Sequence, residues 1–206
     1  MSNLVVLEPI QQTVMTVKIE GISPFIQHKW AEKSLQMLRD KHAGVRVKNR
    51  EVRDPEQEFK DASYKLDDGR YGFPAGGIKA CLIGAAHKDI GLEKTLLRKS
   101  LFIRPDDKRN NLIALETDDP IMREDIVRVG AGSTDLRYRP EFAEWAMVLT
   151  LEYDSKALTQ EAILNLIDRA GFGVGLGEWR PEKGGEYGRF HLDRSYGIDT
   201  INERVA

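Results

Sequence analysis

Residues 162–191 read AILNLIDRAGFGVGLGEWRPEKGGEYGRFH, in which a helical pattern runs into a glycine-rich segment. The apolar positions of the first part recur at the spacing of one helix face, which predicts an amphipathic helix. Thr159 is suited to cap the start of that helix, and Gly171 stands where a left-handed residue often ends one. Residues 187–190 then predict a strand. The apolar helix positions are Ile163, Leu166, Ile167 and Ala170.

A glycine-rich loop separates the predicted helix from the predicted strand. So many glycines let backbone amides approach a ligand or a neighbouring chain without obstruction by side chains. The loop also carries one aromatic plane and three cations, a mixture that suits a phosphate-bearing polymer better than a small apolar ligand. These four residues are Trp179, Arg180, Lys183 and Arg189. The glycines are Gly171, Gly173, Gly175, Gly177, Gly184, Gly185 and Gly188.

Length and composition are those of one soluble domain. A chain of 206 residues can bury a core, and 41% hydrophobic with 31% charged residues is ordinary for a soluble protein. No apolar run approaches the length of a bilayer span, and the first residues lack the order of a signal peptide. The single cysteine, Cys81, has apolar neighbours and excludes an internal disulfide. We therefore expect a core cysteine, a reducing cytoplasmic setting and no membrane association.

The rest of the chain predicts strands and helices in an α+β arrangement. Strict alternation of apolar and polar residues predicts half-buried strands over 13–20 and 146–153. The segments 101–103 and 112–115 flank a polar turn and predict a hairpin. Residues 54–65 are acidic and polar, which indicates a mobile excursion. A short helix is predicted over 92–99. A second helix is predicted after Pro74, with a buried face formed by Ile78, Cys81, Leu82 and Ala85. A third is predicted after Pro24, with a buried face formed by Ala31, Leu35 and Leu38.

The formal net charge of −2 limits how this protein can contact nucleic acid. A protein that depends on nonspecific DNA binding usually has a strongly basic domain, and this chain does not. Contact with nucleic acid must therefore come from local groups of cations.

One such group is Arg46, Lys48 and Arg50, which alternate with two valines. If this stretch is extended, its cations share one face at a spacing of about 6.6 Å, two residues of strand rise. That spacing is close to the separation of phosphates in an extended single strand. The alternative is an edge strand that its charges protect from pairing with other chains. We keep both interpretations.

A second group of cations brackets residues 122–140, which have weak periodicity and a flexible Gly130-Ala131-Gly132-Ser133 run. Phosphate contact is one role for these arginines. Because acidic residues lie among them, a salt-bridged surface loop is the alternative. The arginines are Arg123, Arg128, Arg137 and Arg139, and the acidic residues are Glu124, Asp125 and Asp135.

The chain has no recognisable catalytic or metal-binding motif. Its four histidines lack metal-ligand spacing, and no phosphate loop, dinucleotide fingerprint or nucleophile elbow is present. We therefore expect no enzyme activity, no metal and no cofactor. His28 is the one weak catalytic candidate, as the general acid or base of RNA cleavage beside Lys29. The alternative is a histidine at a helix start that packs against Trp30.

Three features together resemble the RAMP superfamily: the opening strand, a Gly-x-Pro segment feeding an x-Ile-Lys-x-x-Leu helix (Gly72–Leu82), and the glycine-rich loop closing on Gly-Arg-Phe. More narrowly, the chain resembles the backbone subunit of CRISPR effector complexes, which polymerises along guide RNA. The resemblance touches scattered positions from Val14 to His191. Its motifs are short and based on glycine.

The resemblance implies a fold, a domain organisation and a role. The fold is a ferredoxin-like, RNA-recognition-type antiparallel sheet with helices on one face and inserted hairpins and loops. Residues 1–206 would form one RAMP-like domain, with an insertion around 43–70 that often carries an RNA-contacting finger and a flexible loop around 120–140. Lys79 matches the polar position of the family's helix. The role is binding of single-stranded RNA by its backbone, with protomers stacked head to tail.

We therefore expect a protein that binds single-stranded RNA (or DNA) and self-associates along it without catalysis. Glu178, Glu182 and Glu186 would repel phosphate unless they face outward, and the chain is short for such a subunit. These departures favour a divergent relative, such as one from a virus or mobile element, as much as a working effector subunit. The first alternative is a homo-oligomeric assembly protein without nucleic acid. The second is a metal-independent processing ribonuclease that uses His28.

Overall fold

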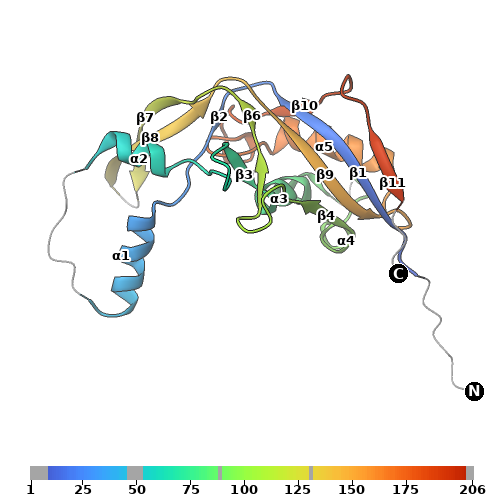
Figure 1. Cartoon of the computed structure of the whole chain (residues 1–206), viewed down its shortest axis with the longest axis horizontal. Helices are drawn as coiled ribbons and strands as arrows, with labels where there is room; N and C mark the ends of the chain where they lie inside the picture. The colour runs from blue at the N-terminus through green and yellow to red at the C-terminus, as the bar shows by residue number, and fades with distance from the viewer. Residues whose placement is uncertain (1–8, 46–52, 88–89, 130–131, 203–206) are drawn as a thin grey trace, which may run out of the picture.

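The structure, a computed structural model, describes residues 9–45, 53–87, 90–129 and 132–202 of the chain. An antiparallel sheet forms its body (Figure 1). The two long central strands pair along nearly their whole length, from Gln12 opposite Asp154 to Glu20 opposite Ala146. The strands of this sheet are β1 (Gln12–Gly21), β4 (Leu101–Arg104), β6 (Glu116–Thr117), β9 (Trp145–Asp154), β10 (Phe190–Leu192) and β11 (Asp199–Asn202).

Two helices connect the strands of the sheet. Helix α3 (Ala75–Ala85) lies between β1 and β4 in the chain, and α5 (Gln160–Gly173) lies between β9 and β10. The strand order is β10-β1-β9-β4, and every neighbouring pair is antiparallel. Each helix therefore joins two strands that run in the same direction, with one opposite strand between them. The predicted α+β class with an antiparallel sheet is confirmed.

The core lies between the sheet and these two helices. Met15, Val17 and Ile19 on β1 are fully buried, and their cross-strand partners on β9 are buried as well. Both helices add apolar side chains to this one cluster, including Ile78 of α3 and Ile167 of α5. Burying a side chain of this size stabilises a fold by about 1.5–3 kcal/mol. The alternation predicted for both strands is confirmed.

The predicted hairpin of 101–103 with 112–115 is wrong. Strand β4 joins the main sheet beside β9, where Leu101 lies opposite Tyr153 and is fully buried. Strand β5 (Leu112–Ala114) pairs with β3 (Gly72–Pro74) in a separate small sheet. Pairing of β4 with the long buried strand β9 is therefore favoured over pairing across the local turn. Helix α4 (Lys94–Ser100), which leads into β4, confirms the helix predicted over 92–99.

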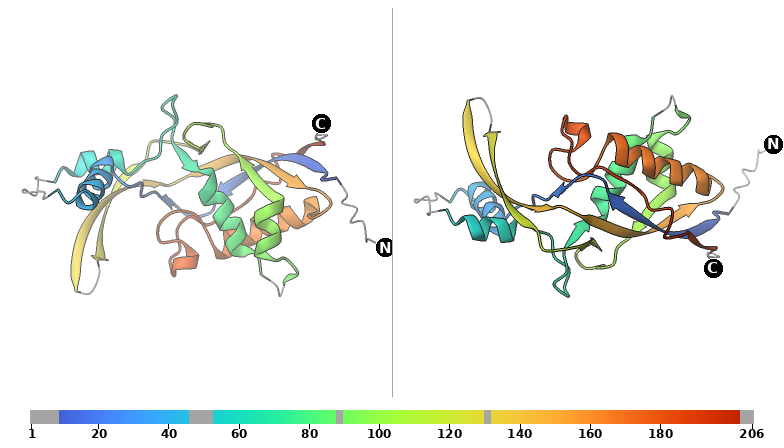
Figure 2. Two further views of the ribbon diagram at one scale, coloured as in Figure 1. Left: turned by 90° about the horizontal axis from the view of Figure 1, so that it is seen from below. Right: turned by 90° about the horizontal axis from the view of Figure 1, so that it is seen from above.

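The described residues of the stretch 120–140, predicted as a flexible loop, instead belong mostly to the two strands of a long hairpin. Strand β7 (Ile121–Val129) pairs with β8 (Ser133–Phe142) from Ile121 opposite Glu141 to Val129 opposite Ser133. The hairpin projects from the sheet, away from the chain ends (Figures 1 and 2). Strand β2 (Phe25–Ile26) pairs with the base of β8.

Two further helices lie at the end of the molecule that carries the hairpin (Figure 2). Helix α2 (Pro55–Asp61) begins at Asp54, whose side chain accepts two backbone N–H bonds, and it packs on β8. The mobile excursion predicted for 54–65 is therefore wrong. Helix α1 (Glu32–His42) leaves Leu38 exposed, contrary to prediction.

Helix α3 confirms Cys81 as a core residue. Burial raises the pKa of the Cys81 thiol to about 12. Ile78 and Leu82 are buried beside it as predicted, and Ala85 is partly buried. Within the described ranges, no helix has both the length and the apolar character needed to cross a membrane.

Candidate nucleic-acid interface

The glycine-rich loop packs against the connection between β1 and β2. The backbone N–H of Glu178 donates to the Ile26 carbonyl at 2.9 Å, and that of Gly188 donates to the Pro24 carbonyl at 2.8 Å. Within the loop, the Leu176 N–H donates to the Gly188 carbonyl at 2.9 Å. These amides, which were expected to face a ligand, are engaged inside the protein.

Gly171 is an interior residue of α5, so the predicted helix end at this position is wrong. The helix begins after Thr159, whose hydroxyl accepts a backbone N–H as predicted, and it ends at Gly173. The left-handed residue is Gly175, with a φ of +72°. A Cβ at Gly171 would lie 1.9 Å from the Phe190 carbonyl oxygen. Glycine at 171 therefore allows α5 to touch β10.

Trp179 is held in an unusual backbone conformation by this loop. Its φ is +53°, and its side chain is 42% exposed. An aromatic residue at positive φ is a genuine outlier that its surroundings must hold in place. The Tyr187 N–H donates to the Trp179 carbonyl at 3.1 Å, and a Cβ at Gly185 would lie 1.7 Å from the same oxygen. The close packing of the loop thus fixes a partly exposed indole.

The three cations of the loop differ in their exposure and in their ion pairing. Arg180 bonds the Glu182 carboxylate at 2.8 Å from its Nη2 atom. Arg189 lies 4.0 Å from Glu186 and stacks its guanidinium over an aromatic ring. Lys183 is exposed on the short helix η2 (Pro181–Lys183). Lys183 is therefore the most accessible of the three cations.

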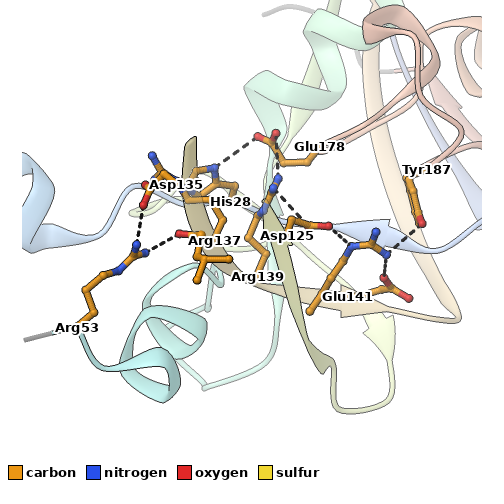
Figure 3. Close-up of polar contacts among 11 residues, drawn as sticks. His28, Arg53, Asp125, Asp135, Arg137, Arg139, Glu141, Glu178 and Tyr187 are labelled. Carbon is orange, nitrogen blue, oxygen red and sulfur yellow. Dashed lines mark hydrogen bonds and ion pairs between the residues drawn. The ribbon is translucent and has the colours of Figure 1, made fainter. Parts of the chain in front are cut away.

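Arg139, predicted to contact phosphate, is buried. Its side chain is 2% exposed, with Nη2 3.3 Å from Asp125 Oδ2 and Nη1 3.4 Å from Glu178 Oε2 (Figure 3). Burial lowers the pKa of the Arg139 guanidinium, and the two carboxylates oppose that shift. A buried guanidinium cannot reach a phosphate chain, so the assignment of Arg139 is wrong.

The neighbours of Arg139 form a network that joins the hairpin to the glycine-rich loop (Figure 3). Arg123 donates to Asp125 at 2.8 Å, to Glu141 at 2.7 Å and to the Tyr187 hydroxyl at 3.0 Å. Ion pairs therefore line the face of the hairpin that meets the loop, as the salt-bridge alternative for these arginines predicted.

The network continues toward α2. Arg137 lies 3.1 Å from Asp135, and Arg53 bonds the same carboxylate at 2.6 Å. Arg53 also bonds Glu58 of α2, so it ties the helix to β8. Arg137 is thus engaged in an ion pair instead of standing free for phosphate.

Of the other cations predicted to bind nucleic acid, two lie apart from the glycine-rich loop and three lie outside the described residues. Arg128 is exposed near the tip of the hairpin. Lys79 donates to the Arg98 carbonyl at 3.1 Å and lies 4.0 Å from the centre of the Phe102 ring. Burial lowers the pKa of Lys79, which acts as a contact between α3, α4 and β4. Finally, Arg46, Lys48 and Arg50 lie outside the described residues.

His28, which lies just after β2, faces Glu178 of the glycine-rich loop (Figure 3). Its Nδ1 atom lies 3.7 Å from Glu178 Oε1. Hydrogen bonding and charge from His28, with further help from Arg139 and Arg180, hold the pKa of Glu178 below its ordinary value, against the effect of burial. His28 thus belongs to the network around the loop, and the catalytic role considered for it stays a prediction.

Glu178→Gln is expected to remove part of the acid dependence of stability. Because the folded-state pKa of Glu178 lies below 4.5, its carboxylate stabilises the fold fully above pH 4.5, and this contribution disappears as pH falls through the folded pKa. The free energy of unfolding of the variant, measured by urea denaturation between pH 7 and pH 3, should approach that of the wild type at low pH. Glu186→Gln, at an exposed position, is the control. A constant offset for Glu178→Gln would contradict the prediction.

Sequence reasoning missed Phe172, which is 72% exposed beside Arg189. The signal was available, because Phe172 is apolar yet lies off the helix face defined by Ile163 and Ile167. It also missed Tyr187, whose contact with Arg123 arises only through tertiary structure. No protein-family model matches this chain, and no curated protein matches it in sequence.

Proposed function

We propose that this chain binds single-stranded nucleic acid, in the first place RNA, and self-associates along the strand without catalysis. The observation that carries the proposal is Trp179. Strained backbone persists only where the surrounding structure holds it, and it concentrates at functional sites. Here the strain presents a partly exposed indole two residues before a short helix that ends in the exposed Lys183. An aromatic plane near a free cation is the combination that binds successive bases and phosphates.

The chain order of the main elements supports the RAMP-like part of the proposal. Strand β1, helix α3, strands β4 and β9, helix α5 and strand β10 follow one another as β-α-β-β-α-β. This is the order of a ferredoxin-like arrangement. The long hairpin and α1 and α2 are then additions at one end of the sheet.

The outer face of the hairpin supports self-association. Ile126 lies opposite Leu136 in the register, so the two side chains share a face, and Met122 follows on the same face. All three are exposed, Ile126 by 73%. Glu124 lies between Met122 and Ile126 on this face, so the apolar surface is interrupted by one charge. Exposed apolar side chains grouped on a projecting element are typical of a protein–protein contact. The inner face of the same hairpin carries the ion pairs of Arg123, Asp125 and Arg139.

Trp179→Ala is expected to weaken binding of a labelled mixed-sequence RNA of about 30 nucleotides by about tenfold, because stacking on one aromatic contributes about 1–3 kcal/mol per base. Trp179→Phe should retain most of the affinity. Trp30→Ala, which removes an exposed tryptophan outside the loop, is the matched control and should change nothing. Fluorescence anisotropy at low salt measures all four proteins. Absence of binding by the wild type would refute the proposed function.

Few phosphate contacts are expected, because most of the predicted arginines carry carboxylate partners. The logarithm of the dissociation constant should therefore rise gently with the logarithm of the salt concentration. Lys183→Ala should reduce that slope by about 0.7, the value for one phosphate contact on a single strand. An unchanged slope in Lys183→Ala would remove this lysine from the interface.

The ion pairs of the hairpin favour a second candidate, a homo-oligomeric assembly protein without nucleic acid. Arg123, Arg137 and Arg139 are each within 3.5 Å of a carboxylate, which leaves them little capacity for phosphate. The mass of the freshly purified particle, with its ratio of absorbance at 260 nm to 280 nm, separates the two functions. A large particle with a clean protein spectrum that also fails to bind added RNA would establish the second.

A further inference from the structure

A cavity of about 560 Å³ opens beside α5 and β10, at the edge of the main sheet. Its lining combines apolar side chains with two charged groups and an imidazole. The residues that matter here are Ile22, Asp168, Phe172, Phe190, His191 and Arg194. It is open to solvent instead of enclosed, so it is a depression of the surface.

The apolar part of the cavity is exposed instead of buried. Phe172, in the last turn of α5, is 72% exposed, and Ile22 is exposed next to it in the lining. The guanidinium carbon of Arg189 lies 5.5 Å from the centre of the Phe172 ring. Arg189 therefore covers part of the ring, and much of the remaining surface stays open for another flat group.

The polar part of the cavity centres on Asp168. Asp168 accepts the Leu192 N–H at 2.9 Å and bonds Arg194 Nη2 at 2.7 Å, so both of its oxygens have partners. Arg194 makes this bond through a single distal nitrogen, and its side chain is 68% exposed. His191, half-exposed on β10, adds a ring nitrogen 3.9 Å from Glu20.

We infer that Phe172 is a second stacking platform, which takes one unpaired base of the single strand into this cavity. The inference rests on the proposed function. The base would lie on the open part of the Phe172 ring, and Arg189 and Arg194 would meet the phosphates on either side of its nucleotide. Stacking of this kind accepts any base, since every base has a π-face. Arg194 bonds Asp168 through one nitrogen and its side chain is 68% exposed, so its remaining N–H groups can donate to a phosphate, which an entirely apolar ligand would not use.

Phe172→Ala tests the inference against a closely matched control. Phe102 is also an exposed phenylalanine with a cation over its ring, Lys79 at 4.0 Å, but it lies on β4 at the opposite edge of the sheet. In the anisotropy assay with the same RNA, Phe172→Ala should weaken binding about tenfold and Phe102→Ala should not. Phe172→Trp should preserve or strengthen binding. Because Phe172 is exposed, its truncation should leave thermal unfolding unchanged.

The outcomes separate this inference from the proposed function. If the wild type binds RNA and Trp179→Ala lowers the affinity while Phe172→Ala does not, only the inference of a second stacking platform is overturned. Wild-type protein that binds no RNA overturns the proposed function and the inference with it. Unchanged affinity in Phe172→Ala with a smaller particle mass would also overturn the inference and assign the cavity to contact with a second copy of the chain. A photocrosslink from 5-iodouracil in the RNA to Phe172 would support it directly.

Discussion

Gly171→Ala is expected to lower the free energy of unfolding by about 3 kcal/mol or more. The new methyl group would lie 1.9 Å from the backbone carbonyl oxygen of Phe190, so β10 or α5 would have to move. Overpacking of a well-packed core costs about 1–3 kcal/mol and occasionally more. The cost of Gly171→Ala is expected at the upper end of this range, because the clashing atom belongs to the backbone and cannot rotate away.

Gly173→Ala provides the matched control for this substitution. Gly173 lies two residues further along the same helix, and a Cβ there would meet no atom within 4 Å. Alanine should be neutral or stabilise the helix by up to about 1 kcal/mol. Urea denaturation of the two variants measures the difference. Equal stabilities would mean that α5 and β10 are not in contact at Gly171.

Arg139→Met is expected to destabilise the protein by about 3 kcal/mol, because it leaves the Asp125 and Glu178 carboxylates facing each other without the charge between them. Removing one partner of a buried ion pair typically costs about 3–5 kcal/mol. Adding Asp125→Asn should recover part of the loss, since it removes the more buried of the two carboxylate charges.

Arg128→Met, on the same hairpin but exposed, is the control and should change stability by less than about 0.5 kcal/mol. Chemical denaturation measures stability, and RNA binding is followed in parallel at a temperature where both variants are folded. Because Arg139 is buried, its loss should leave RNA affinity per folded molecule unchanged. A stable Arg139→Met variant with lost affinity would restore the original assignment to phosphate.

The central sheet was predictable because its strands carry their own signal. Alternation in β1 and β9 follows from one buried and one exposed face, and this requires no knowledge of the partner strand. The apolar stripe of α5 was legible for the same reason. Gly171 was misassigned because the need for glycine there comes from Phe190, which lies on another element.

The sequence did not predict this hairpin, because ion-paired charges lie on its inner face while apolar side chains are exposed on its outer face. Its inner face carries Arg123, Asp125 and Arg139, and its outer face carries Ile126 and Leu136, so charge did not mark the solvent side. The phosphate contact predicted for Arg139 is opposed by its burial for a related reason. A carboxylate 39 residues away in sequence neutralises Arg139, and only the fold brings Glu178 to it.

The pairing of β1 has a consequence for synthesis on the ribosome. This strand takes its neighbours from β9 on one side and from β10 and β11 on the other, so its partners lie more than 120 residues downstream. Strand β1 must therefore wait without these partners until the chain has been translated as far as β9 (Trp145–Asp154). Chaperone holding of this nascent segment follows from that delay, and truncation before residue 190 would leave one side of β1 without β10 and β11.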